Sequence, residues 1–101
     1  MGGVGDEQLL ASLATLVLKS NELTAELLAH LAEVDERRLH VERGVSSLFA
    51  YCTERLGMSE SVAGRRITAA RVGRRFADLG VFARVARGTL NLTTLCALIR
   101  F

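Results

Sequence analysis

The chain of 101 residues is 50% hydrophobic, contains no proline and only five aromatic residues, and has a formal net charge of +2 at pH 7. This composition excludes an intrinsically disordered chain and suits one small, helix-rich domain with a modest core. The two cysteines form no CxxC pair and the two histidines lack ligand spacing, so neither a disulfide framework nor a zinc site of the usual pattern is expected.

The first residues carry no targeting signal. Residues 1–5 are rich in glycine and lack the basic and apolar regions of a signal peptide, so they are expected to be a flexible N-terminus. No apolar run approaches the ~20 residues of a membrane-spanning helix. We therefore expect a cytoplasmic protein that has no membrane partner.

A single long helix is predicted from Asp6 to Arg38, because one row of positions recurs at alternating steps of four and three. Ser20 and His30 are polar interruptions of this row. A break near Ser20 is the alternative, since the segment 21–24 could cap a new helix. The row, called here the leucine stripe, consists of Leu9, Leu13, Leu16, Ser20, Leu23, Leu27, His30 and Val34.

The length of this helix predicts an oligomer. A helix of that length measures ~50 Å, whereas a compact domain of this size has a radius of gyration of about 13 Å. Part of the helix must overhang, and its leucines then need a partner. We expect a homodimer, with Ser20 and His30 setting its register. The expected interface residues are Leu9, Leu13, Leu16, Leu23, Leu27 and Val34.

Residues 46–76 predict two helices joined by a tight turn. Ser46 or Ser47 can cap the first helix, because a serine oxygen accepts one of the free backbone N–H groups there. Gly57 ends that helix, since glycine enters the left-handed cap conformation without penalty. One apolar side of the first helix is expected to comprise Leu48, Phe49, Cys52 and Leu56.

The second helix of this unit begins after Ser59, a good N-cap, with Glu60 in its first turn, where the helix dipole favours an acid. The pair resembles a helix-turn-helix, whose second helix reads DNA in the DNA-binding versions. The second helix presents a basic ridge between two apolar sides. Such a ridge can be only a solvated face, but phosphate contact also requires it. The expected nucleic-acid-binding residues are Ser59, Ser61, Arg65, Arg71 and Arg75.

The charge is divided unevenly between the two halves of the chain. Residues 1–50 hold eight acids and four basic residues, whereas residues 51–101 hold nine arginines and three acids. This asymmetry indicates an acidic partner for the second half. Arginine makes up nearly all of the basic residues, which favours bidentate phosphate or carboxylate contacts, although a GC-rich genome produces the same bias.

The last part of the chain, residues 79–101, predicts one or two short helices, with Asn91 as an N-cap. Cys52 and Cys96 are both expected to be small buried hydrophobes. The chain stops at Phe101 within an apolar run, which suggests a truncated reading frame, a fragment or a stand-alone remnant. The predicted fold class is all-α, with a long N-terminal helix, a helix-turn-helix-like pair and short C-terminal helices in a single domain over 6–101.

Several segments carry a resemblance to a known family, and they follow one another in a consistent order through about residues 9–100. They are residues 23–35, 46–52, 56–60, 65–67, 69–71, 74–76 and 88–95. In this order they resemble the helical region ahead of the nuclease domain in bacterial HNH endonuclease-like proteins. The resemblance implies a nuclease-associated module that handles DNA, and full-length relatives would be endonucleases. It does not imply catalysis, because an HNH nuclease needs a histidine-rich metal unit.

Two functional classes follow from these patterns. The first is a non-catalytic DNA-binding module, and the alternative is a dimerisation or interaction module that positions a nuclease or another partner. An enzyme is not expected, because the sequence shows no nucleophile–base pair, carboxylate pair or metal cluster. No cofactor and no small-molecule substrate are expected.

Overall fold

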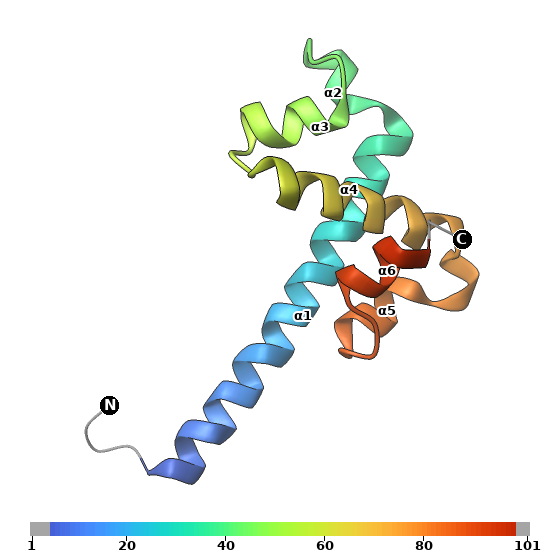
Figure 1. Ribbon diagram of the computed structural model, residues 1–101. Helices are drawn as coiled ribbons and strands as arrows, with labels where there is room; N and C mark the ends of the chain where they lie inside the picture. The colour runs from blue at the N-terminus through green and yellow to red at the C-terminus, as the bar shows by residue number, and fades with distance from the viewer. Residues whose placement is uncertain (1–4, 99–101) are drawn as a thin grey trace.

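The computed structural model describes residues 5–98, which are built from helices and contain no strand (Figure 1). This confirms the all-α prediction, with a long first helix followed by shorter ones. The elements are α1 (Asp6–Arg37), α2 (Leu39–Glu42), α3 (Leu48–Ala50), the π-helical turn η1 (Tyr51–Arg55), α4 (Glu60–Arg75), the 3-10 turn η2 (Ala77–Leu79), α5 (Val81–Ala86) and α6 (Leu92–Leu98).

Helix α1 runs without interruption for 32 residues, so the alternative of a break near Ser20 is wrong. Its N-cap is Gly5, and Asp6 lies in the first turn, where its charge complements the helix dipole. The helix ends one residue earlier than predicted, because Arg38 adopts a left-handed conformation with φ of 53° and donates its backbone N–H to the carbonyl oxygen of Asp35. The expected flexible N-terminus falls mostly outside the described residues.

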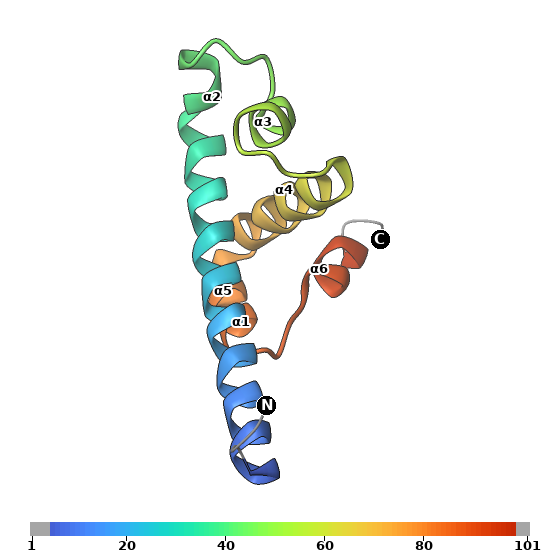
Figure 2. The ribbon, with the colours of Figure 1, turned by 90° about the vertical axis from the view of Figure 1, so that its left-hand side faces the viewer.

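The N-terminal half of α1 projects beyond the other helices (Figures 1 and 2). The described chain measures 51 × 30 × 21 Å and has a radius of gyration of 16.1 Å, larger than the ~13 Å of a compact domain of this length. Every residue from Gly5 to Ser20 is exposed. The predicted overhang is therefore present, and residues 5–20 are called the overhang below.

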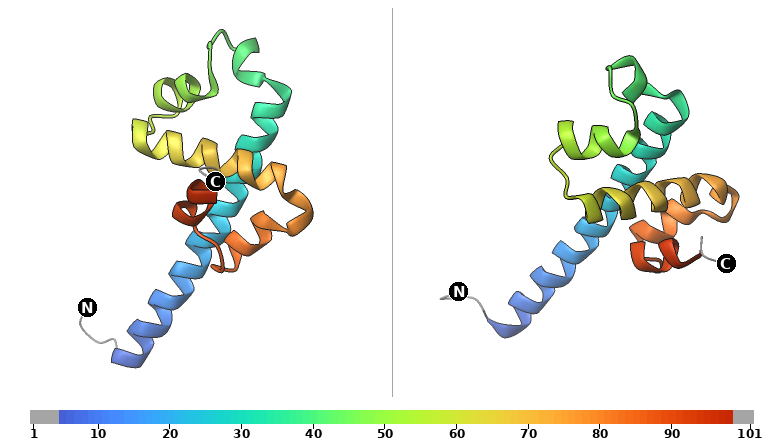
Figure 3. Two further views of the ribbon diagram at one scale, coloured as in Figure 1. Left: turned by 45° about the vertical axis from the view of Figure 1, so that its right-hand side comes forward. Right: turned by 45° about the horizontal axis from the view of Figure 1, so that its top comes forward.

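Helix α4 crosses the C-terminal half of α1 and is enclosed by α3, α5 and α6 (Figures 2 and 3). Small side chains dominate the crossing, which lets the two backbones approach closely. The smaller predicted apolar side of α4 is buried, whereas the larger one is buried only in part, because Val62 is half-buried and Phe76 is 37% exposed. The core residues contributed by the two helices are Ala25, Leu28, Leu31, Ala32, Ala63, Ile67, Ala69, Ala70 and Val72.

The unit of α3, η1 and α4 has the predicted caps. Ser47 Oγ accepts a hydrogen bond from the backbone N–H of Ala50 at 2.9 Å, and Ser59 Oγ accepts one from Val62 at 3.3 Å. Gly57 has a φ of 71°, as a helix-ending glycine requires.

The apolar side expected for the first helix of this unit is wrong in part. Leu48 and Cys52 are buried, but Phe49 is 40% exposed and Leu56 is 51% exposed. The helix widens at η1, where Leu56 donates its backbone N–H to Tyr51, five residues earlier. A π-helical turn holds more residues than an α-turn, so it rotates Leu56 out of line with Leu48 and Cys52.

The C-terminal helices close the core against α1 and α4. Asn91 Oδ1 accepts a hydrogen bond from the backbone N–H of Thr94 at 2.9 Å, as predicted for an N-cap. Leu95 of α6 is fully buried. Cys96 is only half-buried, contrary to the expectation, and its thiol donates to the carbonyl oxygen of Arg65. The chain end at Phe101 lies outside the described residues.

Two glycines within α4 provide a matched test of this packing. A Cβ atom added at Gly73 would overlap the ring of Phe82, whereas one added at Gly64 would meet nothing within 4 Å. Gly73→Ala should lower the free energy of unfolding by about 1–3 kcal/mol through overpacking. Gly64→Ala should raise it by about 0.5–1 kcal/mol through helix propensity. Urea unfolding followed by circular dichroism measures both, and equal effects would contradict the packing described.

Candidate interaction surfaces

The leucine stripe is divided between the overhang and the body of the protein. Leu9, Leu13, Leu16 and Leu23 are 43–65% exposed. Leu27 and Val34, the other two predicted interface residues, are partly buried because they pack against the core. Four of the six predicted interface residues are thus exposed, and the other two contact the body of the protein.

A second apolar row lies beside the stripe on α1. In the C-terminal half of the helix this row contains the buried residues Leu28 and Leu31. Leu10 and Val17 continue the same row along the overhang, where they are 64% and 52% exposed. The helix side that α1 buries against its own domain therefore continues along the overhang, where it is exposed.

An apolar groove of about 270 Å³ lies where the stripe passes the unit of α3 and η1. Its floor and walls are almost entirely non-polar, and His30 at its edge has Nδ1 bonded to the carbonyl oxygen of Glu26 at 2.7 Å. The sequence did not predict this groove, because it depends on how η1 packs against α1. The lining residues are Leu27, His30, Leu31, Val34, Tyr51, Leu56 and Met58.

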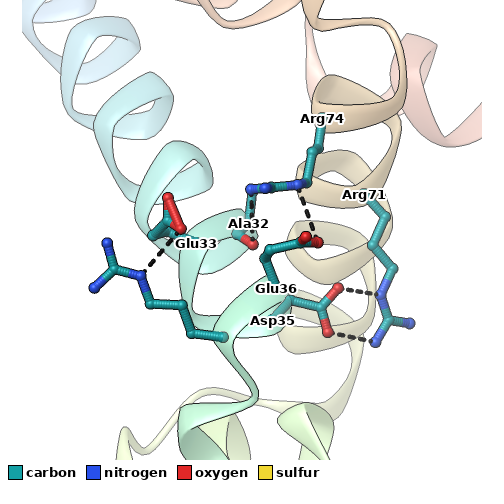
Figure 4. A network of polar contacts seen from close by, with 7 residues as sticks. Ala32, Glu33, Asp35, Glu36, Arg71 and Arg74 are labelled. Atoms are coloured by element: carbon teal, nitrogen blue, oxygen red, sulfur yellow. Dashed lines mark hydrogen bonds and ion pairs between the residues drawn. The ribbon is translucent and has the colours of Figure 1, made fainter.

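The structure places Arg71 in an interhelical ion pair rather than on a free basic ridge (Figure 4). Its Nε and Nη2 atoms donate to the two carboxylate oxygens of Asp35 at 3.0 and 3.1 Å. Hydrogen bonding from Arg71 lowers the pKa of Asp35, although partial burial opposes that shift. A bidentate pair of this kind fixes the orientation of both side chains.

Arg74 makes a second link between the same two helices. Its Nε lies 3.3 Å from Glu36 Oε2, and its Nη1 donates to the carbonyl oxygen of Ala32 at 3.5 Å (Figure 4). The partners in the two pairs lie 36 and 38 residues apart in the chain, so no local pattern in the sequence signals them. In each pair a carboxylate of the same chain balances the arginine charge. The sequence alone had predicted an acidic partner for these arginines.

The other predicted nucleic-acid-binding residues lie at opposite ends of α4. Ser59 is engaged as the N-cap, Ser61 is exposed, and Arg65 Nε donates to the carbonyl oxygen of Ser61 at 3.4 Å. Arg75 is exposed, with its guanidinium carbon 5.5 Å from the centre of the Phe76 ring. Arg65 and Arg75 are separated by ~15 Å along the helix axis, so the five residues form no single cluster.

The ion pair between Asp35 and Arg71 predicts a pH-dependent contribution to stability. Because the pKa of Asp35 is lowered in the folded state, its contribution is complete above the ordinary value of about 3.9 and is lost as the pH falls through the lower, folded value. Asp35→Asn should therefore lower the free energy of unfolding by roughly 1 kcal/mol at pH 7. The difference from the parent should shrink below about pH 4.

Glu33→Gln is the matched control, because Glu33 pairs with Arg37 on the surface of a single helix turn. Its effect should stay within a few tenths of a kcal/mol. Chemical unfolding at a series of pH values measures both variants. A constant difference between Asp35→Asn and the parent from pH 7 to pH 3 would contradict the assignment.

Three or more His, Cys, Asp or Glu side chains that could hold a metal ion are not found together within residues 5–98. In the same part of the chain, no helix has both the length and the apolar character needed to cross a membrane. Comparison with protein-family models, curated proteins and solved structures finds nothing that matches this chain.

Proposed function

We propose that the chain is a helical assembly module that self-associates through the leucine stripe of α1. The observation that carries this proposal is the overhang, in which every residue is exposed although it includes large apolar side chains in two adjacent rows. Apolar surface of this extent on a small domain marks a site of protein association.

Two energetic considerations support self-association. The overhang makes up about half of a 32-residue helix, and helices in proteins gain most of their stability from packing of an apolar face. Full burial of a leucine or valine side chain contributes about 1.5–3 kcal/mol. Covering several half-exposed side chains would therefore stabilise both the helix and the complex. The apolar overhang residues concerned are Leu9, Leu10, Leu13, Leu16 and Val17.

Leu16 and Leu18 allow a matched test of this function. Both are exposed leucines on the overhang, but Leu16 belongs to the stripe and Leu18 lies on another side of the helix. Leu16→Glu should convert a dimer into a monomer, because it places a charge in the interface, and Leu18→Glu should leave the dimer intact. Sedimentation equilibrium gives the mass, and circular dichroism checks that the helices remain.

Both variants should fold, because neither side chain packs within the body of the protein. A parent protein that remains monomeric at high concentration would overturn the proposed function. Equal effects of the two substitutions would show that the stripe does not form the interface.

A second candidate function is DNA binding by α4 and its neighbours, supported by arginines that make no ion pair within the described residues. Such arginines attract an acidic polymer. The resemblance to the region ahead of an HNH nuclease domain supports the same function. Self-association would present two arginine-rich helices, as dimeric DNA-binding proteins do. The arginines concerned are Arg65, Arg66, Arg75, Arg84 and Arg87.

The DNA proposal is tested with two double substitutions. Arg65→Ala with Arg75→Ala should weaken binding to any duplex and flatten the plot of log affinity against log salt by about two units, one for each phosphate that the variant no longer neutralises. Arg37→Ala with Arg38→Ala, on the acidic first helix, should change it much less. Fluorescence anisotropy of a labelled duplex at several salt concentrations measures both. No binding in low salt would exclude this function and leave the assembly module.

A further inference from the structure

We propose that two copies of α1 pair antiparallel, so that the overhang of each copy lies in the apolar groove of the other. This inference rests on the proposed self-association and specifies its geometry. The spacing of the stripe, the residues that flank it and the position of the groove all support it.

The spacing of the stripe reads the same from either end, with steps of four and three in alternation. In an antiparallel pair centred between residues 21 and 22, each stripe position of the overhang meets a stripe position in the C-terminal half of α1 of the other copy, where Leu27 and Val34 pack against the core. The resulting pairs are Leu9 with Val34, Leu13 with His30, Leu16 with Leu27, and Ser20 with Leu23. The overlap covers residues 9–34, which is ~38 Å of helix in a molecule 51 Å long.

The residues on the two sides of the stripe decide the direction. One flank is polar, and the other is apolar apart from one threonine. In a parallel pair, each polar flank would face the apolar flank of the second helix, whereas in an antiparallel pair like flanks meet. The polar flank is Ser12, Lys19, Glu26 and Glu33, and the apolar flank is Leu10, Val17, Thr24 and Leu31.

Charge complementarity supports the antiparallel direction. On the polar side, Lys19 of each copy lies opposite Glu26 of the other, so the two-fold symmetry forms this pair twice. A parallel pair would instead place Lys19 opposite Thr24 and Glu26 opposite Leu31. Salt bridges at these flanking positions are the interactions that set helix orientation in coiled coils.

The groove provides the site for the apolar flank. In the antiparallel pair, Leu10 of one copy lies opposite Leu31 of the other, and Leu31 is one of the residues that line the groove. Leu10 is 64% exposed and Leu56 at the groove edge is 51% exposed, so the contact covers both. The same geometry thus explains two apolar surfaces that lie at opposite ends of α1.

A charge-swap series tests the direction. Lys19→Glu alone places like charges opposite one another twice in the antiparallel dimer, and so does Glu26→Lys alone. Each single variant should raise the dimer dissociation constant by roughly tenfold. The double variant restores both pairs and should return close to the parent value. Sedimentation velocity over a concentration series measures the constants at low salt.

Cross-linking gives an independent reading in a chain that carries Cys52→Ala and Cys96→Ser. Ser12 and Glu33 are exposed and lie opposite each other in the antiparallel pair. Ser12→Cys and Glu33→Cys chains, mixed and refolded together, should be joined by a short bismaleimide. Neither variant should cross-link with itself, because the two copies of residue 12 lie about 28 Å apart along the axis and the two copies of residue 33 about 34 Å apart.

The outcomes separate the two proposals. Rescue by the double charge swap and cross-linking only in the mixture would support the antiparallel pair. A dimer in which single-cysteine chains cross-link with themselves, and in which the double swap is not rescued, would overturn the direction but leave self-association standing. A monomeric parent would remove both proposals.

Discussion

The crossing of α4 over the C-terminal half of α1 is the contact on which the rest of the structure depends. Alanine residues at the crossing let the two helices pack closely, and the pairs Asp35–Arg71 and Glu36–Arg74 join them at one end. Because α4 has 16 residues and α1 has 32, and α4 lies across α1 rather than along it, the body of the protein covers only part of the long helix. The exposed overhang is a direct consequence of this geometry.

The second apolar row of α1 therefore lies in two environments. In the C-terminal half, Leu28 and Leu31 are buried in the core, whereas Leu10 and Val17 continue their row in solvent. A helix that presents one continuous apolar face beyond its own domain is suited to a partner of the same construction. The proposed pairing with a second copy would cover this face without any other protein, because the groove beside η1 and the overhang are present on the same chain.

Some arginines of α4 form ion pairs with α1, and the others make no ion pair within the described residues. Arg71 and Arg74 hold α4 against α1, and their charges are balanced by Asp35 and Glu36. The number of arginines in the second half of the chain is thus larger than the number that an acidic partner could contact without displacing a carboxylate of the chain itself. Contact with a phosphate backbone at Arg71 would have to compete with a bidentate carboxylate already in place, so DNA binding would depend on the arginines outside these pairs.

The amino-acid sequence by itself determined the features that depend on near neighbours in the chain. The period of the leucine stripe predicted α1, and Ser47, Ser59 and Asn91 were recognisable as caps, because each acts on N–H groups two or three residues away. Only the tertiary structure decided which apolar residues are buried: η1 moves Leu56 away from Leu48, and Cys96 remains half-buried. It also decided the partner of Arg71 and the position of the groove, because both depend on contacts between segments far apart in sequence, which no local periodicity encodes.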